Sequence, residues 1–432
     1  MKRQIYDELK NWKTDSSRKP LILRGARQVG KTWIMKEFGS HEFKNMAYLN
    51  CEKNESAKTL FRDNFDVHRI IRGISALTKV DINPDNTLIV LDEIQEVPRA
   101  IQSLKYFYED APEYYVCAAG SLLGLKLRGE FSYPVGKVDE IYMFPMNFEE
   151  FVLAVEGEVS YQMLLKSPLD ELSSISEKWK ELLRQYYFTG GMPEVVKAYV
   201  DGKGLERVRR IQNTILSNYD DDISKHADPR TAIRIHQVWM SMAQQLSKEN
   251  KKFVYAHIQK GARAKDYETA ITWLIDAGLI YRIPCVTKPC IPLKFYEEVG
   301  SFKLYYVDCG LMGALSEAPA DQILIGDNIF IEYKGAFTEQ YVLQQMLTKH
   351  NTSFFYYHPE NSNQEVDFMS QNGNQVYAIE VKAEENLKAK SLRMMKDEFP
   401  ETVALRISMS DFREQDWLVN IPLYTVCRMF SL

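Results

Sequence analysis

The sequence predicts an α/β protein with a parallel sheet in its N-terminal part and a second α/β unit at its C-terminal end. Over residues 1–150, short apolar runs alternate with helix-like segments, and such sequential alternation produces parallel strands covered by helices. Near the C-terminus, an Asn-Gly pair separates two strand-like runs, which predicts a hairpin. A chain of 432 residues is also too long for one core. The predicted N-terminal strands are 21–24, 46–50, 87–91, 114–119 and 140–143.

The first predicted strand leads into the spacing of a phosphate-binding loop. Residues 25–32 follow the pattern G-x-x-x-x-G-K-T, with an apolar run before them and a helix-like segment after them. The glycines let backbone N–H groups turn toward phosphate oxygens, Lys31 reaches the β- and γ-phosphates, and the Thr32 hydroxyl ligates Mg²⁺. The sequence therefore predicts a site for ATP and Mg²⁺. Its predicted nucleotide-binding residues are Gly25, Ala26, Arg27, Gln28, Val29, Gly30, Lys31 and Thr32.

Two further strands end in polar residues that belong beside this loop. The apolar run 87–91 ends at Asp92 and Glu93, and the run 114–119 is followed by Gly120 and Ser121. In a parallel sheet, ligands bind at the carboxyl ends of the strands. We therefore expect Asp92 to be the partner of Thr32 on Mg²⁺ and Glu93 to polarise the attacking water. Ser121 either contacts the water or the γ-phosphate, or is a plain turn serine.

Composition excludes several classes of protein. The chain is 45% hydrophobic and 26% charged, which is ordinary for a globular protein, and no apolar run approaches the length of a membrane span or signal peptide. We therefore expect a cytoplasmic protein without membrane association. Six cysteines form no C-x-x-C pair, so reduced structural thiols are expected in place of a zinc site. The net charge of −5 argues against a uniformly basic surface but permits a local basic patch.

The middle of the chain has a mainly helical pattern. Residues 148–229 are helix-like, with a sharp break at Gly190-Gly191 before Pro193. Residues 264–278 have helical periodicity closed by a glycine, and 281–283 is a possible wing strand. Residues 248–265 hold a local excess of cations: Lys248, Lys251, Lys252, Lys260, Arg263 and Lys265. It either contacts DNA phosphates as part of a winged helix-turn-helix or is a solvated loop on a packing domain.

The C-terminal hairpin predicts a second chemical site. With Asn372-Gly373 as a type I′ turn, Gln371 opposes Asn374 and Asp367 opposes Ala378. Side chains alternate with period two, so Asp367, Glu380 and Lys382 share one face of the hairpin. Two carboxylates on one face can share Mg²⁺ or Mn²⁺, and the lysine can hold the attacking water or stabilise the transition state.

The spacing D-x12-E-x-K resembles that of the restriction-endonuclease-like PD-(D/E)XK nucleases. The resemblance assigns Asp367, Glu380 and Lys382 as catalytic residues, and Asp367, Glu380 and the helical Glu339 as metal ligands. Val366 stands where these nucleases usually have a proline. A hairpin with a surface ion pair is the alternative, and a nuclease fold without activity is another.

Taken together, these residues resemble a widespread prokaryotic family of AAA-type ATPases with a winged-helix segment and a C-terminal, restriction-endonuclease-related domain of unknown function. The matching segments are 24–32, 91–95, 190–194, 365–368 and 379–382. The resemblance implies an AAA+ P-loop ATPase core at 1–150, a helical lid at 151–230, a winged-helix-like domain at 231–327 and a PD-(D/E)XK nuclease-like domain at 328–432. AAA+ rings use an arginine from the neighbouring subunit. Arg128, or else Arg99, is the candidate in a possible homo-oligomer.

Two functional hypotheses follow. In the first, the protein is a Mg²⁺-dependent ATPase that binds DNA and couples ATP binding or hydrolysis to nucleic-acid processing through its nuclease-like domain. In the second, it is a nucleotide-operated regulatory switch whose nuclease-like domain is inactive and serves for docking. The set Asp367, Glu380 and Lys382 favours the first hypothesis, and the acidity of the chain favours the second.

Overall fold

The computed structural model describes residues 1–121, 123–126, 133–248, 250–325, 331–349, 352–360, 362, 364–383 and 389–430. The chain divides into two compact units. Unit 1 is Met1–Phe144 with Asp276–Leu279, and unit 2 is Pro145–Ile275 with Ile280–Leu432. The four domains expected from the sequence remain a prediction. Within the described residues, no helix is long and apolar enough to span a membrane.

Unit 1 contains a five-stranded parallel sheet in the order β2-β3-β4-β1-β5. All five predicted strands are confirmed, with ends within one residue of the expected ones. The elements are α1 (Ile5–Thr14), β1 (Leu21–Arg24), α2 (Lys31–Glu42), β2 (Asn45–Asn50), α3 (Glu55–Leu60), α4 (Val67–Thr78), β3 (Thr87–Asp92), the short 3-10 helix η1 (Ile94–Glu96), α5 (Pro98–Asp110), β4 (Tyr115–Ala119), α6 (Leu123–Lys126) and β5 (Asp139–Tyr142).

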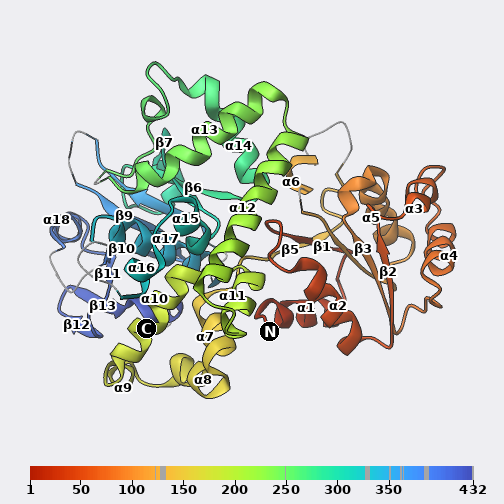
Figure 1. Ribbon diagram of the computed structural model, residues 1–432, viewed down its shortest axis with the longest axis horizontal. Coiled ribbons are helices and arrows are strands. Elements are labelled where there is room, and N and C mark those ends of the chain that lie inside the picture. The colour runs from red at the N-terminus through yellow and green to blue at the C-terminus, as the bar shows by residue number, and fades with distance from the viewer. Residues whose placement is uncertain are drawn as a thin grey trace. The chain divides into compact units, whose positions relative to one another are not determined.

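Helices cover both faces of this sheet, which is why its central strands β1, β3 and β4 are almost entirely buried, whereas the edge strand β5 is partly exposed. Alternate strand residues such as Ile22, Ile89 and Val116 pack with α4 and α5 in one core, and α1 and α2 cover the opposite face. β3 is buried along its entire length. Figure 1 shows the unit-1 sheet in red to orange with its helices on either side. The order of strands matters for function, because β4 lies between β1 and β3 and brings three strand ends to one edge.

Unit 2 begins with helices and ends in a mixed sheet. Its elements are α7 (Phe148–Glu156), α8 (Glu158–Lys166), α9 (Leu169–Ser173), α10 (Ser176–Thr189), α11 (Pro193–Val200), α12 (Leu205–His226), α13 (Pro229–Leu246), η2 (Tyr255–His257), α14 (Ala264–Asp276), β6 (Ile280–Val286), η3 (Leu293–Tyr296), β7 (Glu297–Tyr306), α15 (Cys309–Leu315), α16 (Ala320–Ile325), α17 (Ile331–Lys349), β8 (Phe354–Tyr357), β9 (Val366–Asn372), β10 (Gln375–Lys382), α18 (Lys390–Glu398), β11 (Val403–Ser408), β12 (Arg413–Gln415), β13 (Leu418–Pro422) and η5 (Leu423–Arg428).

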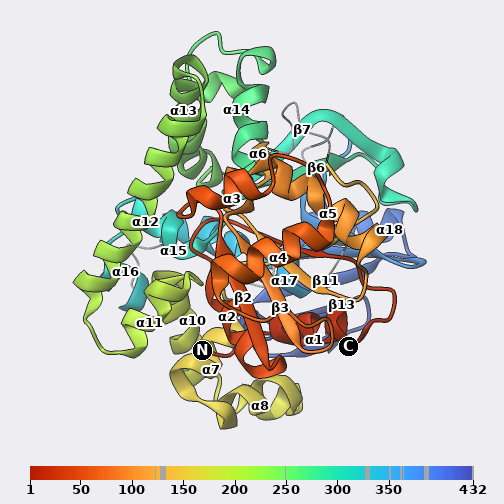
Figure 2. The ribbon, with the colours of Figure 1, turned by 90° about the vertical axis from the view of Figure 1, so that its right-hand side faces the viewer.

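The sheet of unit 2 has eight strands in the order β12-β13-β11-β10-β9-β8-β6-β7. The hairpin of β6 and β7 therefore extends the sheet that carries the predicted nuclease-like residues, because β6 pairs in parallel with β8. The helices α13 and α14, which precede this sheet in the chain, lie side by side, as Figures 1 and 2 both show. This arrangement unites the segments expected to form a winged helix and a nuclease-like domain in one compact unit.

The Gly190-Gly191 break is a packing requirement of unit 2. A Cβ on Gly191 would lie 2.0 Å from the backbone oxygen of Met146, and one on Gly190 would lie 2.0 Å from Oδ1 of Asp308. Gly190 also has a φ of 68°, which favours glycine. Asp308 is fully buried and accepts the N–H of Gly191 at 2.6 Å and that of Leu311 at 3.0 Å. The break thus joins the end of α10 to the beginning of α15.

Candidate functional site

The loop between β1 and α2 has the backbone conformation that phosphate binding requires. Gly25, Gln28 and Gly30 have φ values of 141°, 67° and 99°. A Cβ on Gly25 would lie 2.2 Å from the carbonyl oxygen of Met143, so no larger residue fits there. The left-handed residues turn the loop so that α2 begins at Lys31 with its N-terminus toward the loop. This geometry agrees with the sequence prediction.

The Lys31 side chain folds back onto the phosphate-binding loop. Its side chain is buried, and its Nζ donates hydrogen bonds to the carbonyl oxygens of Gly25 at 2.8 Å and Ala26 at 2.7 Å. Burial lowers the pKa of Lys31 to about 8, against the opposing influence of Glu93 and Asp92. A phosphate group would favour the charged form of Lys31 and replace the carbonyl contacts with stronger ones in which both partners are charged.

Thr32 and Asp92 are in direct contact, as the sequence predicted for a shared Mg²⁺ site. The Thr32 hydroxyl donates to Oδ2 of Asp92 at 2.9 Å. Tyr48, two residues before the carboxyl end of β2, donates its hydroxyl to the same oxygen at 2.6 Å. Burial and then the bond to Asp92 raise the pKa of Tyr48. Hydroxyl and carboxylate oxygens are the ligands that Mg²⁺ prefers, so these residues fit the ion that ATP brings.

Sequence reasoning missed Tyr48, because no motif spacing marks it. Its signal is positional: β2 pairs in register with β3, and Asn50 and Asp92 are opposite each other at the carboxyl end. Tyr48 is two residues before that end and on the same side as Asn50.

Glu93 is held by two polar side chains. The Ser121 hydroxyl donates to Oε2 of Glu93 at 3.1 Å, and the Gln95 amide donates to the same oxygen at 2.6 Å. Glu93 has a φ of 49°, an uncommon and strained backbone conformation for a residue with a side chain. With this left-handed backbone, the carboxylate reaches Ser121 beyond the end of β4. Ser121 therefore contacts the predicted catalytic residue, and Gln95 is a second contact that the sequence did not reveal.

Of the two candidate arginine fingers, only Arg99 lies within the described residues. Arg128 lies outside the described residues. The Arg99 guanidinium donates to the carbonyl oxygen of Phe61 at 2.8 Å and lies 4.3 Å from the ring centre of Phe65. Arg99 therefore makes contacts within its own unit, and an arginine finger at this position stays a prediction.

In unit 2, the hairpin of β9 and β10 differs by two residues from the predicted register. Gln375 pairs with Asn372, and Ala378 pairs with Met369. The two-residue loop is therefore Gly373-Asn374 and not Asn372-Gly373. Only Gly373 of the pair has a positive φ, 57°, as in a type II′ turn, whereas the predicted type I′ turn needs two. The predicted register and the predicted turn type were therefore both wrong, because an Asn-Gly pair is compatible with either position of the two-residue loop.

The predicted face survives this shift, because a displacement of two residues preserves the alternation of side chains. Asp367 and Glu380 influence each other electrostatically, and Lys382 pairs with Glu380 at 2.6 Å. Glu339 reaches the same cluster from α17, and its carboxylate and that of Asp367 are in hydrogen-bond contact. Asp367 accepts the backbone N–H of Val381 at 2.7 Å. The four predicted residues therefore come together.

Three basic or phenolic side chains complete the cluster, and sequence reasoning did not assign them to it. Lys251 forms an ion pair with Oε1 of Glu339, and the Tyr305 hydroxyl donates to Oε2 at 3.2 Å. Lys303, which is fully buried on β7, pairs with Glu365 at 2.6 Å and also faces Glu339 and Asp367. Lys251 was expected among the DNA-contacting cations. The structure places it against Glu339 with its side chain 14% exposed.

The charges of the cluster are strongly coupled. Burial, followed by the charges of Glu339 and Glu380, raises the pKa of Asp367 well above its ordinary range. Burial acts in the same direction on Glu339, but Lys251 and Lys303 outweigh it and hold the pKa of Glu339 below its ordinary value. Burial also raises the pKa of Glu380, against the influence of Lys382. Glu339 is therefore the ionised member of its pair with Asp367.

The cluster offers only part of the ligand set that a metal ion needs. Among the described residues, no three acidic, histidine or cysteine side chains are positioned to hold one ion together. The ammonium of Lys251 occupies one oxygen of Glu339, and that of Lys382 occupies one of Glu380. The other oxygen of Glu380, Oε2, is buried and makes no hydrogen bond to the described residues. This oxygen and Asp367 fit a cation, whereas Glu339 joins them only when Lys251 withdraws.

Comparisons with known proteins support the N-terminal part of this description. Residues 17–152 match a family described as an AAA domain. Residues 180–322 and 334–425 match two families described as domains of unknown function, DUF8612 and DUF4143. No match was found among curated proteins. With the loop geometry, the first match indicates that the N-terminal part is a P-loop domain of the AAA ATPase type, with ATP as its ligand.

Three solved structures illustrate what the chain is similar to. The Walker-type ATPase PABY2304 of Pyrococcus abyssi has 13% identity and a TM-score of 0.46, covering 73% of this chain and 95% of that chain. The Orc1 protein of Aeropyrum pernix in complex with DNA has 11% identity and a TM-score of 0.28, covering 73% and 91%. Cdc6p of Pyrobaculum aerophilum has 12% identity and a TM-score of 0.25, covering 75% and 92%.

Proposed function

We propose that the protein is a Mg²⁺-dependent ATPase that binds DNA and couples ATP turnover to nucleic-acid processing at its C-terminal site. The observation that carries the ATPase part is the convergence of three strand ends. Thr32 and Asp92 contact each other beside the loop that buries Lys31. Glu93 and Ser121, which follow β3 and β4, also contact each other. Separate strands thus supply phosphate, metal and water contacts at one edge.

The residues divide the work of ATP hydrolysis among them. Lys31 and the backbone N–H groups of the loop hold the phosphates. Thr32 and Asp92 hold Mg²⁺, which neutralises charge on the phosphates when bound. Glu93 accepts hydrogen bonds from Ser121 and Gln95, so its carboxylate is oriented before a water arrives. An oriented carboxylate at this place suits the polarisation of the attacking water.

The C-terminal cluster supports the nucleic-acid-processing part. Asp367, Glu380, Lys382 and Glu339 come from two strands and one helix and lie in mutual electrostatic contact. Such a set fits a nuclease-like site, in which carboxylates bind a divalent cation and a lysine stabilises developing negative charge. In our proposal, the cation enters as Lys251 leaves Glu339, because both compete for the same oxygen.

Exposed cations on the segment before and at the beginning of α14 support DNA binding. Lys260, Arg263 and Lys265 are exposed, and Lys252 is half-buried. Phosphate contacts from such residues release counterions and lead to salt-dependent binding. A homo-oligomer, in which a neighbouring subunit supplies an arginine, is part of the same proposal.

A specific observation favours the second candidate function. The Lys251–Glu339 ion pair closes the C-terminal site and leaves no three-ligand metal cage among the described residues. A permanently closed site would suit a nucleotide-operated switch with an inactive, docking nuclease-like domain. The two candidates therefore differ in whether Lys251 ever leaves Glu339.

The deciding experiment incubates the full-length protein with labelled single- and double-stranded DNA, in Mg²⁺ or Mn²⁺, with and without ATP. We expect metal-dependent cleavage that Asp367→Ala and Lys382→Ala each eliminate, while ATP hydrolysis continues at the wild-type rate. Glu93→Gln is the matched control, because it should stop ATP hydrolysis and leave the C-terminal residues unchanged. Absence of cleavage under every condition would leave the switch as the function that fits the site.

A further inference from the structure

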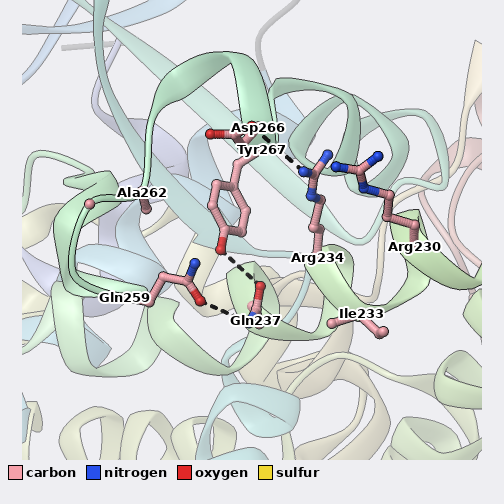
Figure 3. Close-up of a pocket in the computed structure, with 9 residues that line it drawn as sticks. Arg230, Ile233, Arg234, Gln237, Gln259, Ala262, Asp266 and Tyr267 are labelled. Carbon is pink, nitrogen blue, oxygen red and sulfur yellow. Dashed lines mark hydrogen bonds and ion pairs between the residues drawn. The ribbon is translucent and has the colours of Figure 1, made fainter.

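A pocket of about 330 Å³ lies between the N-terminal half of α13, the loop after η2 and the beginning of α14. Figure 3 shows the Arg230 and Arg234 side chains together on one side of it and Gln259 on the other. The pocket shares no residue with the nucleotide site or with the C-terminal cluster. Its volume is at the lower end of the range typical of small-ligand sites.

The polar groups of the pocket come from both helices and from the loop after η2. Gln237 accepts the Tyr267 hydroxyl at 2.8 Å and its amide lies 3.5 Å from Oε1 of Gln259. Arg234 pairs with Asp266 at 3.6 Å. The charge of Arg234 is thus balanced within the pocket, whereas Arg230 is exposed at its rim and adds one net positive charge.

This chemistry matches one nucleotide of a nucleic-acid chain. A guanidinium binds a phosphate with paired N–H donors, and glutamine amides donate to and accept from the edges of bases. The exposed Arg230 suits the phosphate, and the amide of Gln259 on the other side of the pocket suits a base, whereas Gln237 contacts Tyr267 and Gln259. Ile233, 61% exposed on the same face of α13, supplies an apolar surface for the sugar or base.

We propose that this pocket binds a single unpaired nucleotide of a DNA strand, with its phosphate on Arg230 and its base against the amide of Gln259. The inference rests on the proposed DNA binding and names the form of nucleic acid that this surface selects. A base within a duplex is stacked and paired, so it reaches an enclosed pocket only after leaving the helix, at a cost in free energy. The pocket therefore favours single-stranded over double-stranded DNA.

The test measures fluorescence anisotropy of three labelled probes with the full-length protein. The probes are a single strand of mixed sequence, the same strand annealed to its complement, and the same strand with abasic sites. Wild type should bind the intact single strand most tightly. Arg230→Ala should weaken this binding by about tenfold, as expected for a lost charge-assisted contact. It should also lower the slope of log affinity against log salt by about 0.7, the value for one single-strand phosphate.

Gln259→Ala separates base contacts from phosphate contacts. It should weaken binding of the intact strand, leave the salt slope unchanged and have no further effect on the abasic strand. Arg210→Ala, which removes an exposed arginine of α12 outside the pocket, is the charge-matched control and should bind like wild type.

The outcomes distinguish this inference from the proposed function. If wild type binds none of the probes, the proposed DNA function fails. If wild type binds but Arg230→Ala matches Arg210→Ala, only the pocket inference is overturned. Equal affinity for duplex and single strand would overturn the selection of an unpaired nucleotide.

Discussion

Replacing Lys251 with methionine removes the cation that closes the C-terminal site. The side chains of Lys251 and Glu339 are only 14% and 4% exposed, so their ion pair is a buried one. Removing one partner of such a pair costs about 3–5 kcal/mol, because the other charge stays buried. We expect Lys251→Met to cost about 3 kcal/mol, the low end, since Tyr305 and Lys303 still contact or face Glu339.

The cost should depend on pH in a defined direction. The pKa of Glu339 is lowered in the folded protein, so its contribution to stability is present above its ordinary pKa of 4.5 and is lost as the pH falls through the folded value. The difference between wild type and Lys251→Met should therefore be largest near neutral pH and shrink in acid. Urea-induced unfolding, followed by tryptophan fluorescence across this pH range, measures it.

The same variant tests whether a cation takes the place of the lysine. Mn²⁺ at 100 times its dissociation constant stabilises a folded protein by about 2.7 kcal/mol. We expect Mn²⁺ to restore most of the stability that Lys251→Met loses and to stabilise wild type less, because Lys251 competes with the metal. Lys252→Met is the matched control, since this neighbouring lysine is not part of the cluster.

Two results would refute this reasoning. A cost below about 1 kcal/mol would be that of an exposed ion pair and would remove Lys251 from the site. Equal stabilisation of wild type and variant by Mn²⁺ would show that the lysine and the metal do not compete.

Three further predictions concern the nucleotide site and the packing of unit 2. Lys31→Ala should abolish tight ATP binding, whereas Glu93→Gln should keep binding and stop hydrolysis; wild-type hydrolysis by both would contradict the site. The pKa of Lys31 is about 8 without nucleotide, and phosphates favour its charged form. ATP binding should therefore take up about 0.9 proton at pH 9 and far less at pH 7. Calorimetry in buffers of different ionisation enthalpy measures this uptake, which Lys31→Met should not show. Gly191→Ala should destabilise unit 2 by about 1–3 kcal/mol in urea titrations, because its Cβ meets the Met146 backbone. Gly335→Ala on α17, with nothing within 4 Å, should not destabilise it.

The nucleotide site was largely determined by the sequence. Its residues are close to one another along the chain or stand at strand ends, so local spacing predicts Lys31, Thr32, Asp92 and Glu93. The parallel sheet then brings the strand ends to one edge. Tyr48 was not predicted because its contact depends on the register of β2 against β3. Gln95 was not predicted because its contact depends on the left-handed turn at Glu93.

The C-terminal cluster shows the limit of local reasoning. The alternation of side chains along β9 and β10 placed Asp367 and Glu380 on one face, and that alternation holds even though the register was wrong by two residues. Only the tertiary structure brings Lys251 and Lys303 to the same cluster, from segments 88 residues before Glu339 and 64 residues before Asp367. Sequence patterns report the periodicity of one element, whereas the burial of opposite charges against each other is decided when distant elements pack.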